Sequence, residues 1–327
     1  MADASIDLLL ATRPRDAVRA EVARQLPRVR AKFLEGTPRA EWLGARAVLL
    51  GSVAREAADW DPAAMPNLEF IQRTFTGLDD LPFDRIPPRV SVAGNVGGYA
   101  PFVAEHALAL ALAAARSIVT AHAQVAAGRL RPPPENRALW RKTAVILGYG
   151  EIGREIADRL RPFRMELAGV NRSGAAAPGV GRMFDADHLR EALAVGDVVF
   201  EARPFTRRTA RTIGAVELAA MPPEGIFVNV GRAGTVDEEA LYRHLVDHPA
   251  FRAAIDVWWQ EGFADGSLRY RFPFPTLPNF VGTPHSAGFA PPVEAYALER
   301  SVANLARFFA GERPRHLVDR DEYPAPR

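Results

Sequence analysis

The sequence predicts an α/β protein with two lobes, each built around a parallel sheet covered by helices. Length is the first observation, because 327 residues exceed the roughly 250–300 at which a single hydrophobic core stops growing. The second is a pattern in which short apolar runs, bounded by glycine, proline or asparagine, alternate with amphipathic stretches of helical length. Strands and helices that alternate in this way form parallel βαβ units. Composition agrees, since 48% apolar and 24% charged residues are ordinary for a folded globular protein.

The first hundred residues supply the elements of the first lobe. Their apolar runs are short enough for strands, and the charged stretches between them have the spacing of amphipathic helices. The apolar runs lie at 6–11, 45–52, 68–75 and 89–95, and the clearest helix-like stretch at 15–26.

A second series of strands and helices begins after a proline-rich surface connection at 129–134. A last helix starts after two prolines, ends near Gly311 and can return to the first lobe. The predicted strands of the second series are 142–150, 165–173, 197–204, 225–231, 251–259 and 279–285, and its helices are 151–163, 185–196, 215–221 and 238–247.

Composition and charge exclude several classes of protein. A net charge of +2 without a basic tail gives no reason to expect nucleic-acid binding. Cysteine is absent, which excludes disulfides and thiolate chemistry, and we expect no metal site. The apolar run near the N-terminus is too short for a signal peptide. The apolar stretch 103–119 is interrupted by charge and falls short of a membrane span of about 20 residues, so it predicts a buried helix. We therefore expect a cytoplasmic protein that does not enter membranes.

The strongest local motif is a glycine-rich turn between a strand and a helix. Gly148, Gly150 and Gly153 have the G-x-G-x-x-G spacing directly after an apolar strand. The first glycine permits a tight turn, the second lets backbone amides approach a pyrophosphate, and the third lets helix and strand pack closely. A turn that merely needs small residues is the alternative. The motif predicts a dinucleotide site that also includes Tyr149, Glu151 and Ile152.

The end of the next strand indicates which dinucleotide is bound. An acid about 20 residues past the glycines usually accepts hydrogen bonds from the adenosine ribose. Here that position reads Asn171-Arg172-Ser173 and has no carboxylate. Because arginine and a hydroxyl suit a 2′-phosphate, the sequence favours NADP(H) over NAD(H). A solvated Arg172 beside a permissive site would leave NAD(H) open.

Several further stretches, taken together, resemble the D-isomer-specific 2-hydroxyacid dehydrogenases. That family includes D-lactate, glyoxylate/hydroxypyruvate, phosphoglycerate and formate dehydrogenases, and the resemblance covers most of the chain. The stretches are FTGLDDLP, FVAEHALALALAAAR, PFTRRTARTIG, VNVGRAGTVDEEAL, AAIDVWWQEG and FVGTPHSAGFA. The resemblance implies an NAD(P)-binding Rossmann domain at 101–290, inserted in a flavodoxin-like substrate and catalytic domain made of 1–100 and 291–327.

The resemblance also implies a catalytic set. Arg232 matches the arginine that grips the substrate carboxylate, which a planar guanidinium can bind bidentately. His285 matches the acid/base histidine, which titrates near neutral pH. Glu261 matches the glutamate that hydrogen-bonds this histidine, holds its orientation and favours its protonated form.

Other positions follow from the same resemblance. Asp256 matches an acid that seats the nicotinamide end of the cofactor, and His106 is expected to be packed or to face the hinge. The remaining histidines are interpreted as solvated. Arg203 stands where the family has an apolar residue, and contact with cofactor, substrate or solvent all stay open. Further expected cofactor residues are Pro204, Val230 and Gly231, and expected substrate residues are Thr76, Gly77 and Leu78, with Arg232 and His285.

These residues together predict an NAD(P)-dependent oxidoreductase that interconverts small 2-oxo acids and D-2-hydroxy acids, of the glyoxylate or hydroxypyruvate type. Formate is disfavoured, because formate dehydrogenases carry glutamine at the position of Glu261. The alternative is a dinucleotide-sensing regulatory protein, since a corepressor branch of the family keeps the same fold and residues. The resemblance further implies a homodimer formed near 103–119.

Overall fold

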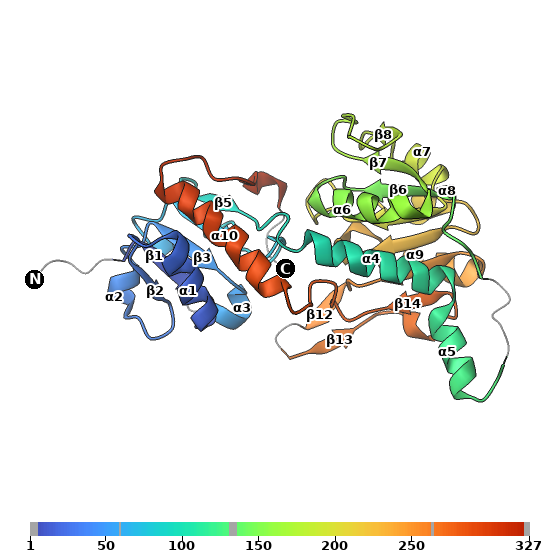
Figure 1. Cartoon of the computed structure of the whole chain (residues 1–327), viewed down its shortest axis with the longest axis horizontal. Coiled ribbons are helices and arrows are strands. Elements are labelled where there is room, and N and C mark those ends of the chain that lie inside the picture. The colour runs from blue at the N-terminus through green and yellow to red at the C-terminus, as the bar shows by residue number, and fades with distance from the viewer. Residues whose placement is uncertain (1–5, 59, 131–135, 263–264, 324–327) are drawn as a thin grey trace, which may run out of the picture. The chain divides into compact units, whose positions relative to one another are not determined.

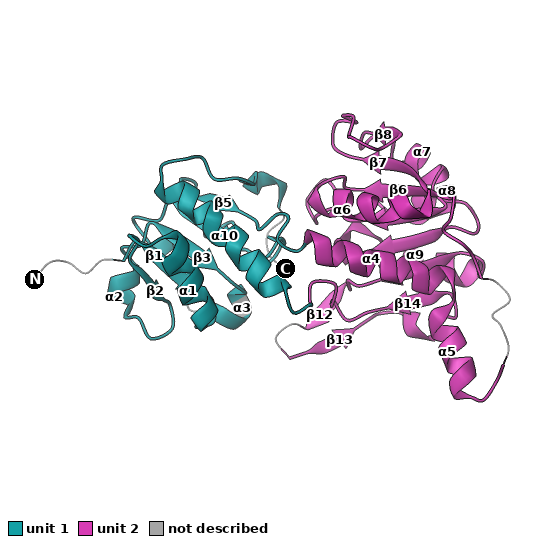
Figure 2. Cartoon of the chain, in the orientation of Figure 1, with its two compact units in different colours: residues 1–99, 290–327 teal, residues 100–289 magenta. Residues whose placement is uncertain are grey.

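The computed structural model describes residues 6–58, 60–130, 136–262 and 265–323 (Figure 1). The predicted proline-rich connection lies largely outside them. The chain divides into two compact units (Figure 2). Unit 1 comprises residues 1–99 and 290–327, and unit 2 comprises residues 100–289.

Unit 1 is built on a five-stranded parallel sheet. Its strand order, β2-β1-β3-β4-β5, is the flavodoxin-like order of doubly wound proteins. The central strands are short runs of fully buried aliphatic residues, which is typical of a parallel sheet covered on both faces. The strands are β1 (Leu8–Ala11), β2 (Ala31–Phe33), β3 (Ala47–Leu50), β4 (Phe70–Arg73) and β5 (Ser91–Ala93).

Helices α1 (Asp16–Gln25) and α10 (Val293–Phe309) pack on one face of this sheet, although they lie at opposite ends of the chain. Val22 and Leu305 belong to the same apolar cluster as Leu10 of β1. A second cluster, on the other face, contains Trp42, Trp60 and Met65. The shorter helices of the unit are α2 (Arg39–Trp42) and α3 (Val53–Glu56), with 3₁₀ turns η1 (Pro62–Ala64) and η5 (Arg320–Glu322).

Unit 2 is built on a seven-stranded parallel sheet. Its order, β14-β11-β10-β9-β6-β7-β8, is the Rossmann order extended by one strand, so the predicted fold class is confirmed. The order reverses between β6 and β9, and ligands of such sheets bind outside the strand ends at this switch point. The strands are β6 (Thr143–Leu147), β7 (Glu166–Val170), β8 (Arg182–Phe184), β9 (Val198–Glu201), β10 (Ile226–Asn229), β11 (Arg252–Ile255) and β14 (Phe280–Gly282).

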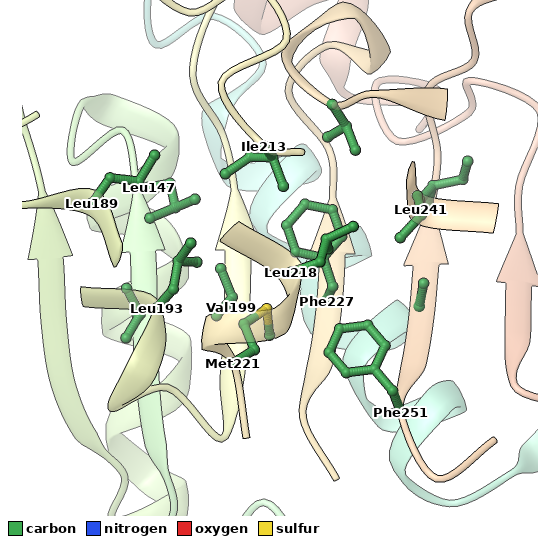
Figure 3. Packing of buried hydrophobic residues seen from close by; sticks show 14 of the residues in the cluster. Leu147, Leu189, Leu193, Val199, Ile213, Leu218, Met221, Phe227, Leu241 and Phe251 are labelled. Carbon is green, nitrogen blue, oxygen red and sulfur yellow. The ribbon is translucent and has the colours of Figure 1, made fainter. Parts of the chain in front are cut away.

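Helices cover both faces of the second sheet. Figure 3 shows Leu147, Val199 and Phe227 of the sheet packed with residues of the helices on one face. α4 (Ala100–Ala115) packs beside α6 (Glu151–Leu160) and against β10 and β11. The remaining helices are α5 (Ile118–Ala126), α7 (Leu189–Ala194), α8 (Ala215–Ala220) and α9 (Glu238–Asp247), with 3₁₀ turns η2 (Arg161–Phe163), η3 (Ala233–Thr235) and η4 (Phe274–Thr276).

Two predicted elements differ in the structure. The apolar stretch 103–119 is not one helix, because Ser117 takes a left-handed conformation (φ 49°) and separates α4 from α5. In the described part of the chain no single helix is long and apolar enough to cross a membrane, and α4 with α5 passes that test only as a pair bent by 61°. The strand expected at 251–259 ends at Ile255, and a hairpin of β12 (Gln260–Gly262) and β13 (Ser267–Arg269) follows.

Candidate active site

In the glycine-rich turn of unit 2, the backbone geometry explains why glycine stands at two of the three motif positions. Gly148 has φ +89°, a conformation that favours glycine. A Cβ on Gly153 would lie 2.5 Å from the carbonyl oxygen of Gly148, so helix α6 and strand β6 can approach only without a side chain there. A Cβ on Gly150 would meet nothing within 4 Å. Two glycines therefore serve the fold, and the third faces open space.

A dinucleotide pyrophosphate could bind at this open side of the turn. Gly150 is the N-cap of α6 and provides no side-chain cap, so the first backbone N–H groups of the helix are available to an anion. The ring of Tyr149 is buried against Gly169, so only its backbone could reach a ligand. Burial also raises the pKa of its hydroxyl. Glu151 is ion-paired with Arg154 (3.1 Å), and Ile152 is half-buried.

At the end of β7, Asn171 shapes the loop that follows. Its amide nitrogen donates to the carbonyl of Ala175 (2.9 Å), and its amide oxygen accepts from the backbone N–H of Ser173 (3.0 Å). Arg172 and Ser173 are exposed. The three predicted residues thus form one turn at the end of β7, the strand that pairs with β6.

An acid that sequence spacing did not reveal lies beside this turn. Asp185, directly after β8, forms an antiparallel bridge with Ser173. Its carboxylate accepts from the ring of His188 (2.6 Å) and from the backbone N–H of Asp187 and His188. The side-chain hydrogen bond from His188 is the main reason that the pKa of Asp185 lies below its usual value. The carboxylate of Asp185 therefore holds the start of α7, and His188, which is exposed as predicted, is hydrogen-bonded to it.

His285 and Glu261 meet in unit 2. The distance between His285 Nδ1 and Glu261 Oε1 is 2.8 Å, and both side chains are partly buried. The same carboxylate oxygen accepts from the backbone N–H of Trp258 (2.8 Å), which holds the acid in place. His285 itself has φ +53°, a strained conformation of the kind found at functional sites.

The turn that carries His285 is organised by Asp256. The backbone N–H of His285 donates to the carbonyl of Asp256 (2.8 Å). The Asp256 carboxylate accepts from the Thr283 hydroxyl (2.6 Å) and from the backbone N–H of Ser286 (2.8 Å) and Ala287 (2.9 Å). Contact with the nicotinamide stays a prediction, whereas the structure shows this acid holding the histidine turn.

His106 of α4 joins the same network, a contact for which the sequence carries no signal. Its Nε2 lies 2.9 Å from the Thr283 hydroxyl and 3.5 Å from Asp256 Oδ1. Burial alone would raise the pKa of Asp256, but the hydrogen bonds from His106, Thr283 and two backbone amides outweigh it and hold that pKa below its ordinary value. Asp256 is thus a stable anion behind the histidine turn.

Arg232 follows β10 in a turn fixed by hydrogen bonds. Asn229 accepts from the backbone N–H of Gly231 (3.1 Å) and donates to the carbonyl of Arg232 (3.3 Å), which also accepts from the Thr235 hydroxyl (2.8 Å). The Arg232 guanidinium is half-buried and donates to the carbonyl of Gly231 (2.9 Å). Val230 is buried, and its backbone N–H donates to the carbonyl of Glu201.

Arg203 is held in a buried ion pair with Glu201, the last residue of β9. Glu201 is fully buried, and its carboxylate accepts from the Arg203 backbone N–H (2.8 Å) and from the guanidinium at 2.5–3.0 Å. A Cβ on Gly148 would come within 2.9 Å of Arg203 Cγ, and one on Gly231 within 2.7 Å of the Arg203 carbonyl. Arg203 therefore lies between the two glycine turns, next to the exposed Pro204.

The two tryptophans that precede Glu261 are structural. Trp258 is buried, and its indole N–H donates to the carbonyl of Thr283 (2.8 Å). Trp259 is also packed against the core: its ring stacks on Phe274 at 5.5 Å, and its N–H donates to the carbonyl of Val236. Both side chains anchor the hairpin that carries Glu261.

Unit 1 contains the predicted substrate loop after β4. Leu78 is buried, Gly77 is half-buried, and the Thr76 hydroxyl donates to the carbonyl of Asn95 (3.0 Å). Buried Arg73 spans the loop by donating to both carboxylate oxygens of Asp80 (2.8 and 3.0 Å). The loop is thus tied at both ends.

Tyr99 follows this region in the chain. Its ring stacks near Phe75 at 6.0 Å, and burial, with a smaller contribution from Glu294, raises the pKa of its hydroxyl to about 12. It is therefore a neutral, largely packed aromatic of unit 1.

Comparison with known proteins agrees with this architecture. The family model described as "D-isomer specific 2-hydroxyacid dehydrogenase, NAD binding domain" matches residues 108–287. Hydroxypyruvate reductase from Thermotoga maritima is 32% identical over 221 residues, which cover 67% of this chain and 70% of the relative.

Two solved structures are similar along nearly the whole chain. One, from Pyrobaculum aerophilum and provisionally assigned as a formate dehydrogenase, is 30% identical with a TM-score of 0.79 and covers 98% of this chain and 100% of its own. The other, a D-isomer specific 2-hydroxyacid dehydrogenase from Xanthobacter autotrophicus Py2 in complex with NADPH and MES, is 26% identical with a TM-score of 0.79 and covers 97% and 98%. The chain therefore belongs to the D-isomer specific 2-hydroxyacid dehydrogenase family.

Proposed function

We propose that the protein is an NAD(P)H-dependent reductase of small 2-oxo acids, of the glyoxylate or hydroxypyruvate type. The observation that carries the proposal is the hydrogen bond between His285 and Glu261, which pairs a proton donor with a carboxylate in a family of hydroxyacid dehydrogenases. The name of the Thermotoga maritima relative supports the substrate class. The glycine turn around Gly150 supports the nicotinamide dinucleotide.

The bound dinucleotide would supply the hydride that reduces carbon 2 of the 2-oxo acid. Arg232 would bind the substrate carboxylate and orient the neighbouring carbonyl. His285 would give a proton to the carbonyl oxygen in reduction and remove it from the hydroxyl in oxidation. Since Nδ1 of His285 is hydrogen-bonded to Glu261, Nε2 would carry the proton that His285 exchanges with the substrate oxygen. The Glu261 carboxylate would stabilise the imidazolium before the transfer.

Glu261 also bears on the choice between 2-oxo acids and formate. Oxidation of formate releases a hydride without any proton transfer to or from oxygen, so it needs no carboxylate beside the histidine. The acid present here supports a substrate whose oxygen gains or loses a proton. We therefore infer that formate is not the substrate, although one similar structure carries that provisional assignment.

The first test is turnover by the purified protein with NADPH and NADH, using glyoxylate, hydroxypyruvate, pyruvate, phenylpyruvate and formate. We expect reduction of at least one 2-oxo acid and no oxidation of formate. His285→Ala should lower kcat by about 10²- to 10⁴-fold with dinucleotide affinity unchanged, because only proton transfer is lost. Arg232→Ala should chiefly raise the KM for the acid.

The same turnover test distinguishes the proposed reductase from the alternative, a dinucleotide-sensing regulatory protein. Tight dinucleotide binding without turnover of any 2-oxo acid would contradict the reductase and favour a dinucleotide-sensing regulatory protein. Full activity of His285→Ala would remove this residue from the mechanism while leaving the reaction class intact.

We further propose that NADP(H) is preferred over NAD(H). Support comes from the exposed Arg172 and Ser173 at the end of β7, and from the engagement of nearby Asp185 with α7. Arg172→Asp should lower the ratio of kcat/KM for NADPH to that for NADH by about tenfold or more, because a carboxylate repels a 2′-phosphate. Arg190→Asp, at an exposed arginine of α7, is the matched control. An unchanged ratio in the Arg172 variant would mean that this turn does not read the 2′-position.

We also infer a homodimer that forms through the α4–α5 region of unit 2. The supporting observation is a set of three exposed apolar side chains on α5, where Ile118 is 54%, Val119 57% and Val125 69% exposed. Apolar groups gathered on one short helix are typical of a surface that another chain covers.

A further inference from the structure

Unit 1 contains a basic pocket that the proposed reaction does not use. The cavity has a volume of about 300 Å³ and lies where β4 and β5 end. Its deepest polar residues, Gln72, Asn95 and Asn304, are nine-tenths or more buried. None of the predicted substrate residues lines it. The full lining consists of Gln72, Gly94, Asn95, Val96, Arg300, Ala303, Asn304, Arg307, Arg315 and His316.

One face of helix α10 and a returning segment of chain bring the basic side chains together. Arg300, Ala303, Asn304 and Arg307 have the i, i+3, i+4, i+7 spacing of a single helical face. Arg315 follows the helix and is fixed because its backbone N–H donates to Asn304 Oδ1 (2.7 Å). The pocket wall is therefore set by secondary structure and backbone hydrogen bonds.

The polar floor of the pocket is internally satisfied and rigid. Asn304 donates to Gln72 Oε1 (2.6 Å) and to the carbonyl of Arg315 (3.0 Å). Asn95 donates to the carbonyls of Thr74 (2.9 Å) and Ala297 (2.8 Å). Because these amides are already used, the arginines at the wall are the groups left to recognise a ligand.

The charges at the wall are only partly compensated. Arg307 is ion-paired with Glu312 (2.8 Å), whereas Arg300 donates only weakly to the carbonyl of Val96 (3.4 Å) and lies over the ring of Tyr296. The guanidinium of Arg315 has no hydrogen bond or ion pair to any residue that the structure describes. No aspartate or glutamate is among the described lining residues.

Three arginines against one carboxylate leave two positive charges around the pocket. Guanidinium groups stay charged at all working pH values and bind oxyanions bidentately. We propose that this pocket is an accessory binding site for a small dianion, either a phosphate group or a pair of carboxylates. The site goes beyond the proposed function and does not depend on it.

Asn95 connects the pocket to the predicted substrate loop of the same unit. Its side chain lines the pocket and holds the carbonyl of Thr74, and its own carbonyl accepts from the Thr76 hydroxyl. An anion bound here would therefore stabilise the segment that positions Thr76.

The test uses the intact protein with saturating NADPH, so that phosphate cannot act through the dinucleotide site. Thermal unfolding is followed with inorganic phosphate, succinate or chloride at constant ionic strength. At about ten times the dissociation constant, a dianion should raise the Tm by roughly 4 °C. A rise with phosphate alone identifies a phosphate site, and one with succinate identifies a dicarboxylate site. An equal rise with chloride would overturn the proposal.

Variants locate the effect. Arg315→Ala should lose at least half of the Tm rise, and Arg315→Glu should lose all of it, without change in the Tm measured in chloride, because this side chain is exposed. Arg313→Ala is the matched control, since Arg313 is an exposed arginine two residues away that does not line the pocket. Retention of the full rise in both Arg315 variants, or an equal loss in the control, would refute the site.

Discussion

At the residue scale, the proposed acid/base pair of His285 and Glu261 is held in place by groups outside the pair. Glu261 is held by the backbone N–H of Trp258, and the turn carrying His285 is held by Asp256. Since small displacements of catalytic groups cost rate steeply, we expect loss of these supporting contacts to slow the proposed reaction. Asp256 is accordingly a positioning residue for the histidine turn.

The buried ion pair of Arg203 and Glu201 has no counterpart in the predictions made from sequence. A charge as buried as Glu201 is tolerated only with a partner, because desolvation disfavours an isolated carboxylate. The sequence left contact with cofactor, substrate or solvent open for Arg203. The structure shows a different contact, in which the side chain pairs with Glu201 at the switch point of the sheet.

His244 predicts how stability depends on pH. The sequence suggested a solvated histidine, which is wrong, because the ring is half-buried and lies edge-on to Phe251 at 4.5 Å. Burial first, and then neighbouring His248, lower the pKa of His244 from 6.5 to about 4. Between these values the unfolded chain binds a proton that the folded chain does not, so the free energy of unfolding falls as pH falls from 6.5 towards about 4.

Replacement of His244 by phenylalanine keeps the ring but removes this proton. We expect the Tm of His244→Phe to depend less steeply on pH than the wild-type Tm across that window, and the two curves to run parallel above it. His122→Asn, at an exposed position of α5, serves as the control and should keep the wild-type slope. Identical slopes for His244→Phe and wild type would contradict the assignment.

At the element scale, the candidate site residues of unit 2 gather at strand ends. In unit 2 the glycine turn follows β6, the Arg203 pair ends β9, and Arg232 follows β10. Parallel strands end at the same edge of a sheet, so residues from distant parts of the sequence gather there. The pocket of unit 1 follows the same rule at the ends of β4 and β5.

The glycine turn yields a matched pair of variants. Gly150→Ala places a methyl group in open space, so it should leave the Tm unchanged and weaken NADPH binding, because the pyrophosphate must approach there. Gly153→Ala places a methyl group 2.5 Å from the Gly148 carbonyl oxygen and should cost about 1–3 kcal/mol of stability. Calorimetric unfolding and dinucleotide titration measure the two effects. Equal destabilisation by both substitutions would contradict the assignment of Gly153 to helix–strand packing and of Gly150 to dinucleotide binding.

At the scale of the whole molecule, two sheets with separate cores share one chain. Among the residues that the structure describes, one apolar cluster of unit 2 is made of unit 2 residues alone, and two clusters of unit 1 combine residues from early and late parts of the chain. The long insertion of one unit in the other is compatible with folding because each buries its own apolar surface.

The proposed dimer is tested at this scale by light scattering on the eluting protein. We expect a mass of two chains for the wild type. Val125→Asp should shift the equilibrium to one chain, since a charge opposes burial of the α5 surface. Val216→Asp is the control, because Val216 is a similarly exposed valine (60%) on α8, away from α5 in the sequence. A monomeric wild type, or dissociation by both substitutions, would argue against this interface.

Several features could be predicted because a local pattern carries them. The parallel α/β class follows from alternating apolar runs and amphipathic stretches, and the glycine turn follows from spacing alone. Element ends were less predictable: the stretch 251–259 looks like one strand because its residues are apolar, yet β11 ends at Ile255. The strand ends next to Asp256, whose hydrogen-bond partners come from the turn after β14. Residues adjacent to Asp256 in the sequence carry no sign of these partners.

Local sequence was therefore enough to predict the fold class and the glycine turn, and the family resemblance supplied the candidates Arg232, Glu261 and His285. Folding brought His285 to Glu261, placed Asp256 behind the histidine turn and paired Arg203 with Glu201. It also gathered the basic side chains of α10 around residues that lie more than two hundred positions earlier. Such contacts depend on the register of strands and the packing of helices, so they exist only once distant segments of the chain are packed together.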